Sequence, residues 1–179
     1  MIALTVAAVV MPRSPSTGGE VDPKAPATVT TKSSRSTIVA SIQDIQAGIP
    51  LLEQRGLSRQ SDPIGLEYRW ESEDRASWIR FYDAGSDGTL DRIAAVFATP
   101  QNDRSQQIVA AGLSLRLIQL ASGTDCTVDA FNEWLSSVAN GNAIQGQSRT
   151  FGSTPAHLQA TLTANGQTGI RLTIGEERH

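Results

Sequence analysis

The sequence predicts an α+β fold of two layers, in which an antiparallel sheet of about six strands packs on about three helices. Residues 64–98 alternate apolar and polar side chains around two tight turns, a pattern typical of a three-stranded meander. Residues 99–140 carry apolar side chains at spacings of three and four, which indicates helices that bury one face. Alternating segments return in residues 149–174, so the expected order is α-βββ-αα-βββ.

Composition excludes several classes of function. The 179 residues carry a net charge of −3, and the only lysines are Lys24 and Lys32. The part of the chain from residue 37 onward therefore has no P-loop lysine, no Schiff-base lysine and no basic footprint for nucleic acid. Because the chain has one cysteine and two histidines, we expect no zinc site. We also expect no other metal and no cofactor.

The N-terminal part differs in composition from the rest. Residues 1–11 hold an apolar run that is too short to cross a membrane, which takes about 20 residues. The run fits the end of a truncated anchor or signal, an atypical signal, or a buried strand. Residues 12–36 are rich in Pro, Ser, Thr and Gly and are expected to form a disordered linker. This layout favours a single domain, residues 37–179, tethered outside the cytoplasm; a cytoplasmic protein is the alternative.

The domain is expected to begin with a helix over residues 37–55, where isoleucine and leucine recur at helical spacing. Ser36 or Thr37 would cap its start. Pro50 interrupts the helix, but the apolar stripe continues past it, so we expect a kink rather than a split. Residues 57–63 are interpreted as a polar connector.

The register of the meander decides which side chains share a face, because side chains alternate along a strand. A turn centred on Asp74 pairs Trp70 with Trp78. The second turn pairs Tyr82 with Arg92. Aliphatic side chains then meet the helices, and the opposite face carries the candidate ligand-binding residues Tyr68, Trp70, Trp78, Arg80, Tyr82 and Arg92.

Aromatic rings and guanidiniums gathered on one sheet face favour a non-enzymatic domain that binds a protein, a peptide or a glycan. Two alternatives use the same face. In the first, the face is buried by the linker, the first helix or a second protomer. In the second, the face mediates assembly of the domain with itself or with a membrane partner. The oligomeric state does not follow from the sequence.

The helix after the meander is expected over residues 99–122, with Thr99 as its N-cap, and to be the most buried helix. Gly112 in its middle indicates close packing on the sheet. The next helix is expected to begin after Thr127 and to end at residues 140–142.

The C-terminal strands are expected to form a hairpin with a turn at Asn165 and Gly166. A plain two-residue turn would place apolar side chains of the first strand opposite the polar set of the second strand, such as Ala160 opposite Arg171. Facing Leu162 with Ile170 requires an extra residue, so a bulge is expected at Gly169.

Two weaker patterns are relevant to metal binding and catalysis. Residues 83–94 partly match a calcium-binding EF-hand loop, but Gly85 and Ala94 occupy positions that need ligands, so a plain Asp-Gly hairpin is favoured. Cys126 and His157 would form the nucleophile and base of a hydrolase, the least favoured function. Asp125 or Asp129 would then orient the base.

Overall fold

The computed structural model describes residues 37–62, 65–100, 103–140, 146–162 and 168–176. Every described residue belongs to one compact unit, Ser34–His179. The expected apolar segment 1–11 and the expected linker 12–36 lie outside the described residues.

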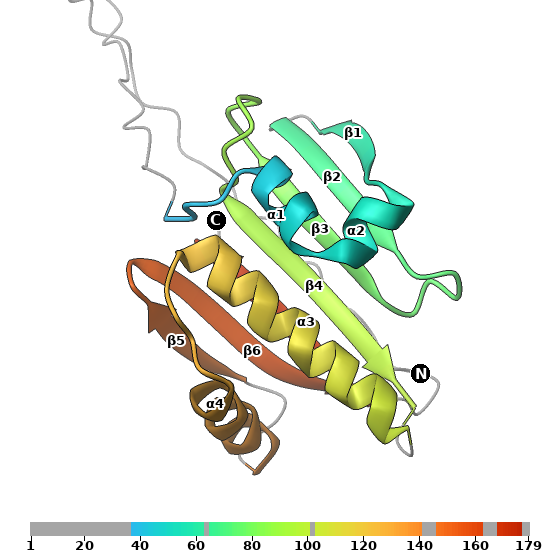
Figure 1. Cartoon of the computed structure of the whole chain (residues 1–179), viewed down its shortest axis with the longest axis vertical. Helices are drawn as coiled ribbons and strands as arrows, with labels where there is room; N and C mark the ends of the chain where they lie inside the picture. Colours follow the sequence, from blue (N-terminus) through green and yellow to red (C-terminus); the bar gives the residue numbers. More distant parts are fainter. Residues whose placement is uncertain (1–36, 63–64, 101–102, 141–145, 163–167, 177–179) are drawn as a thin grey trace, which may run out of the picture. The chain divides into compact units, whose positions relative to one another are not determined.

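The described strands form one seven-stranded antiparallel sheet with the order β1-β2-β3-β4-β7-β6-β5 (Figure 1). Two meanders, β1 to β4 and β5 to β7, meet at the centre, where β4 pairs with β7. The α+β class and the antiparallel sheet are thus confirmed, and β1 is a strand where a connector was expected. The strands are β1 (Ser58–Asp62), β2 (Gly65–Glu71), β3 (Trp78–Asp83), β4 (Arg92–Thr99), β5 (Gln147–Phe151), β6 (Thr154–Leu162) and β7 (Thr168–Gly175).

The described helices pack on one face of the sheet and leave the other face without a helix (Figure 1). α3 contacts β4, β6 and β7, α4 contacts β6, and α1 and α2 lie in front of β2 and β3. None of these helices is long and apolar enough to span a membrane. Their bounds are α1 (Ile42–Gly48), α2 (Pro50–Arg55), α3 (Arg104–Ser122) and α4 (Val128–Asn140).

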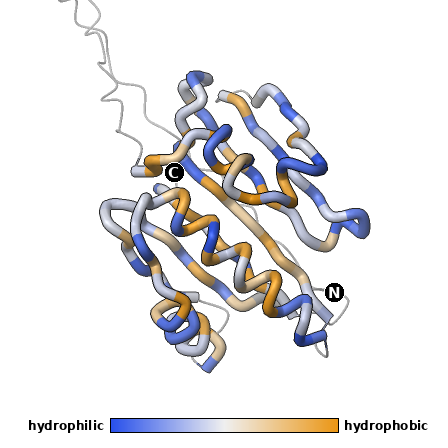
Figure 2. The backbone as a smooth tube through the Cα atoms, in the orientation of Figure 1, coloured by the Kyte–Doolittle hydropathy of each residue, from blue (hydrophilic) through white to orange (hydrophobic). Residues whose placement is uncertain are grey.

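The core lies between the two layers, and Figure 2 shows apolar residues gathering along β4 and α3. Both halves of the chain contribute to one continuous cluster, so the two meanders share a single core. Its largest fully buried side chains are Phe81, Phe131, Ile45, Ile49, Leu52, Ile79, Leu90, Ile93, Leu117, Ile118, Leu158 and Leu172.

The expectation of one kinked N-terminal helix is wrong, because the chain splits at Ile49, which is extended (φ −130°, ψ 97°). Pro50 starts α2 at the first helical position, where a missing N–H removes no helical hydrogen bond. α1 starts later than expected, since Ser41 is the N-cap and forms a capping box with Asp44. The apolar residues on both sides of the break still face the core, and Leu52 is fully buried.

The expected register between β2 and β3 is wrong by one residue. Trp70 lies opposite Ile79 rather than Trp78. The cause is the hairpin loop: Ser72 N donates to Ser77 O (2.9 Å), and Ser77 N donates to Ser72 Oγ (3.0 Å). These bonds centre the turn between two residues instead of on Asp74. Tyr68 and Trp70 consequently join the helix-covered face. The expected pairing of Tyr82 with Arg92 is confirmed.

α3 differs from its expectation in its first half. Thr99 ends β4, and Asp103 is the N-cap, accepting a hydrogen bond from Gln106 N (3.0 Å). Ile108 and Val109 are 63% and 60% exposed, so this half is not buried. Close packing at Gly112 is also wrong, because a Cβ there would meet nothing within 4 Å. α4 begins as expected, with Thr127 Oγ1 accepting from Ala130 N (3.2 Å).

The register of the C-terminal hairpin also differs. Ala160 lies opposite Ile170, and Leu162 lies opposite Thr168, so the expected pairing of Leu162 with Ile170 is wrong. Gly169 pairs in register with Thr161, without a bulge. Residues 163–167 connect the two strands, whose described pairing is regular up to Leu162 and Thr168. Those five residues, with the expected turn at Asn165 and Gly166, lie outside the described part of the chain.

Candidate functional site

The helix-free face of the sheet carries a patch that we call the arginine–aromatic face. Residues paired across antiparallel strands point to the same side, so the observed register assembles the patch in rows across β2, β3, β4 and β7. The patch comprises Glu67, Arg69, Glu71, Trp78, Arg80, Tyr82, Arg92, Ala94, Val96 and Arg171.

Two arginines of this face stack on aromatic rings. The guanidinium carbon of Arg92 lies 4.1 Å from the ring centroid of Tyr82. That of Arg80 lies 4.8 Å from the ring of Trp78. Each cation–π contact contributes about 0.5–2 kcal/mol and restricts the side chain. The guanidiniums are thus held in place before any partner arrives.

Glu67 is the negative centre of the arginine–aromatic face. Its Oε1 accepts hydrogen bonds from Nε (2.9 Å) and Nη2 (2.6 Å) of Arg69 and lies 3.9 Å from Nε of Arg80. The last distance is that of an ion pair without a hydrogen bond, and Nε of Arg80 is buried without a hydrogen-bond partner among the residues that the structure describes. Hydrogen bonding to Glu67 raises the pKa of Arg69 above its usual value. Glu67 itself is almost fully buried, so its charge is committed to these two arginines.

The other two arginines of the face have no such partner. Arg92 and Arg171 form no ion pair with any of the residues that the structure describes. The face carries four arginines and two glutamates, so its formal charge is +4 − 2 = +2. Half of its cations are therefore available to an anionic partner.

The structure brings together only part of the predicted site. Trp78, Arg80, Tyr82 and Arg92 share the helix-free face, as expected. Their grouping with Tyr68 and Trp70 is wrong for the reason given above, and Trp70 is only 7% exposed on the helix side.

Sequence reasoning missed Glu67, Arg69 and Arg171 as members of the face. The first two alternate with Leu66, Tyr68 and Trp70, so the corrected register would have included them. Arg171 enters through the pairing of β7 with β4, which local patterns do not reveal.

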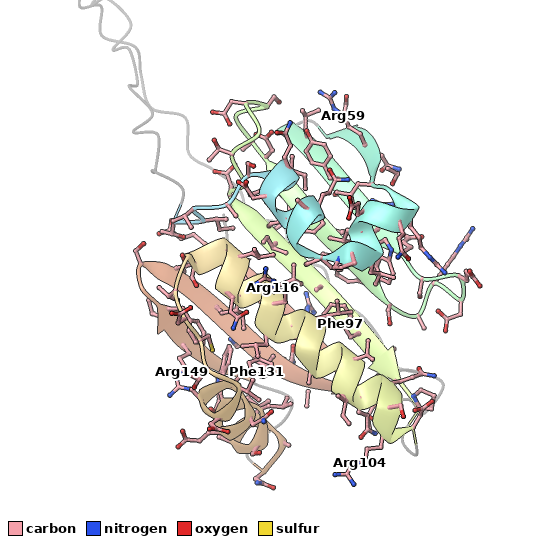
Figure 3. The ribbon with its side chains drawn as sticks, in the orientation of Figure 1. Arg59, Phe97, Arg104, Arg116, Phe131 and Arg149 are labelled. Atoms are coloured by element: carbon pink, nitrogen blue, oxygen red, sulfur yellow. The ribbon has the colours of Figure 1, made fainter. Side chains whose placement is uncertain are left out.

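On the helix side, a cleft of about 680 Å³ lies between α2 and the first half of α3. The β2–β3 hairpin closes one end of it. Figure 3 shows Phe97 on β4 in the gap between the two helices, and Trp70 lines the cleft beside it. The lining also includes Leu51 and Arg55 of α2, Ser72, Glu73, Asp74 and Ser77 of the hairpin, and Ser105, Gln106, Val109, Ala110 and Leu113 of α3.

The rim of the cleft is charged. Arg55 Nη2 donates to Glu73 Oε1 (2.8 Å), which joins α2 to the hairpin. Asp74 Oδ1 accepts from Ser72 Oγ (2.5 Å) and from Ala76 N (3.1 Å). The Ser72 hydroxyl and this backbone N–H hold the pKa of Asp74 below its usual value, so it is ionised at neutral pH.

The partial EF-hand match is a hydrogen-bonded hairpin loop. Asp83 is fully buried and accepts from Asp87 N (3.2 Å) and Gly88 N (2.8 Å). Asp91 Oδ2 accepts from Ala84 N (2.7 Å). These carboxylates stabilise the turn, and across the described residues no group of three or more His, Cys, Asp or Glu is placed to hold a metal ion.

The proposed hydrolase pair is not assembled. Cys126 is buried in the core on the helix side, and its burial raises the pKa of the thiol. His157 on β6 lies opposite Thr173 and points to the helix-free face of the sheet. Its Nδ1 is 2.9 Å from Ser148 Oγ. The sheet separates the two side chains, so they do not meet as nucleophile and base.

Two surfaces remain as candidate sites, the arginine–aromatic face and the cleft between α2 and α3. They lie on opposite sides of the sheet and share no residue. No family model matches the chain, and no curated protein or solved structure matches it either.

Proposed function

We propose that this chain is a non-enzymatic binding domain whose arginine–aromatic face docks on an acidic surface of another protein. The observation that carries the proposal is that Arg92, stacked on Tyr82, and Arg171 form no ion pair with the described residues, on a face that also carries Trp78. Arg, Trp and Tyr dominate the centres of protein interfaces, where Lys is depleted. An open sheet face offers a broad contact surface, which suits a protein better than a small molecule.

The charge of the face favours an acidic partner over a second copy of the chain. The face carries +2, whereas the whole chain carries −3. Two copies docked face to face would oppose arginine to arginine, and like charges across an interface cost several kcal/mol. Self-assembly through this face, the alternative function, therefore has less support than binding of a different, acidic protein.

We also propose that the domain acts outside the cytoplasm and is tethered through residues 1–36. The support is the sequence layout, an apolar run followed by a Pro/Ser/Thr-rich segment. Cell fractionation with an antibody against the domain tests it. Recovery with membranes after a carbonate wash is expected, and recovery in the cytosol would contradict the tether.

The binding proposal is tested with the full chain and a synthetic random copolymer of Glu and Tyr, measured by isothermal titration calorimetry at low salt. We expect saturable binding that weakens as salt is added, because arginine–carboxylate contacts are screened. A copolymer of Lys and Tyr is the charge-reversed probe, and any binding of it to the acidic remainder of the chain should not be weakened by replacing Arg92 and Arg171. Absence of binding to the acidic copolymer would overturn the proposal.

A matched pair of double variants locates the binding surface. Arg92→Gln with Arg171→Gln is expected to weaken binding about tenfold or more. Arg59→Gln with Arg104→Gln removes the same charge from exposed residues that extend away from the domain on the helix side (Figure 3). This control is expected to change affinity by less than about twofold. Equal losses in the two variants would mean that only net charge matters and would overturn the site.

A further inference from the structure

We propose that the cleft between α2 and α3 is a second binding site, which takes a small primary amine with an apolar body. The cleft measures about 680 Å³, and sites for small molecules are typically about 300–1,000 Å³. This inference is independent of the sheet face, because the two surfaces share no residue.

The cleft follows from how the helices pack. Gly48, the last residue of α1, lies so close to α3 that an added Cβ would be 2.7 Å from Cδ1 of Leu120. Arg116 Nε also donates to Gly48 O (3.3 Å). These contacts fix the second half of α3 against α1. The first half of α3 is not held in this way, so α2 and α3 stand apart over the end of β4.

The interior of the cleft is apolar and incompletely covered. Trp70 and Phe97 line it from the sheet, and Val109 lines it from α3 while remaining 60% exposed. Val109 is therefore an apolar side chain that is open to solvent at the cleft. Apolar side chains that line a cavity are typical of a ligand site. The indole Nε1 of Trp70 is buried and has no hydrogen-bond partner among the described residues, so the surroundings of this floor residue are not complete.

The rim decides the charge of the ligand. Arg55 is paired with Glu73, and Asp74 has no cationic partner among the described residues, so the three rim charges sum to +1 − 2 = −1. Oδ1 of Asp74 accepts two hydrogen bonds, while its second oxygen accepts none from the described residues. An ammonium group donates up to three hydrogen bonds and can use that oxygen. A carboxylate in the same place would be repelled.

The test uses the full chain with three probes of equal chain length at neutral pH: decylammonium and decanoate, each below its micelle concentration, and 1-decanol below its solubility limit. Calorimetry is expected to show one site, with decylammonium bound about fivefold or more tightly than decanoate. In ¹⁵N–¹H spectra the indole signal of Trp70 should move, while that of Trp78 on the other face stays in place. Equal or tighter binding of decanoate would overturn the proposed ligand class.

Two variants and their controls locate the site. Val109→Gln should weaken all three probes, and Asp74→Asn should weaken decylammonium alone. The controls are Val128→Gln, at a valine 59% exposed on α4, and Asp125→Asn, both away from the cleft. No binding of decylammonium, or equal effects of Val109→Gln and Val128→Gln, would overturn the site. Neither result bears on the sheet face, because Arg92 and Arg171 lie outside the cleft.

Discussion

Arg69 on β2 and Arg80 on β3 lie directly opposite each other on the helix-free face. Like charges in this position destabilise a sheet. The carboxylate of Glu67 offsets the repulsion, since it lies 2.6 Å from Nη2 of Arg69 and 3.9 Å from Nε of Arg80. The arginine–aromatic face therefore depends on one almost fully buried acid for its stability.

Replacing that acid should destabilise the fold. Glu67→Gln leaves two partly buried guanidiniums without their counter-charge, and we expect the free energy of unfolding to fall by about 1–3 kcal/mol. Urea denaturation measures the change. Glu71→Gln is the control, because Glu71 is exposed and 4.0 Å from Arg69, and it should change stability by less than about 0.5 kcal/mol. Equal effects would show that Glu67 has no special role.

The two glycines at the helix layer should respond in opposite ways to alanine. At Gly112 an added Cβ meets nothing within 4 Å, so Gly112→Ala should stabilise the protein by about 0.5–1 kcal/mol through helix propensity. At Gly48 the added Cβ would be 2.7 Å from Leu120, so Gly48→Ala should lower stability. Thermal unfolding of both variants measures this. A destabilised Gly112→Ala would mean that this face of α3 is covered.

The capping box of α1 predicts part of the acid sensitivity. The hydroxyl and N–H of Ser41 hold the pKa of Asp44 below its usual value of 3.8. Because the pKa is lower in the folded state, the stabilisation is present above pH 3.8 and is lost as the pH falls through the folded value. Asp44→Asn should therefore lower Tm at neutral pH and flatten its decline between about pH 5 and 2. An unchanged acid limb would contradict this.

The thiol of Cys126 should be slow to react. Burial raises its pKa, so little of the reactive thiolate is present in the native protein at neutral pH. Labelling with Ellman's reagent is expected to be slow in the native state and fast in urea. Cys126→Ala should leave binding of the acidic copolymer unchanged. Fast labelling of the native protein would show that the core opens at this point.

Local patterns in the sequence were enough for the fold class. Alternation around Phe81 and Ile93 predicted the β3–β4 register, and Thr127 marked the start of α4. They were insufficient at the β2–β3 hairpin, because its register depends on hydrogen bonds between Ser72 and Ser77 that give no periodic signal. The resulting one-residue error moved Tyr68 and Trp70 to the wrong face.

Contacts between residues far apart in the sequence could not be predicted from periodic patterns. Arg171 joins the arginine–aromatic face only because β7 pairs with β4, where Arg171 lies opposite Val96, 75 positions away in the sequence. Similarly, the apolar spacing in residues 99–122 suggested burial of the whole helix, but Ile108 and Val109 are exposed. The cleft arises from where two helices separate, and that depends on packing at Gly48 and Leu120.

The three tryptophans give the most direct test of the central claim, because Trp78 is on the arginine–aromatic face, Trp70 is in the cleft and Trp134 is in the core under α4. We would record the ¹⁵N–¹H indole signals during titration with the copolymer of Glu and Tyr. We expect the Trp78 signal to shift and saturate while the other two stay in place. Binding that leaves Trp78 unmoved, or that moves Trp70 or Trp134 instead, would contradict the assignment of the sheet face as the binding surface.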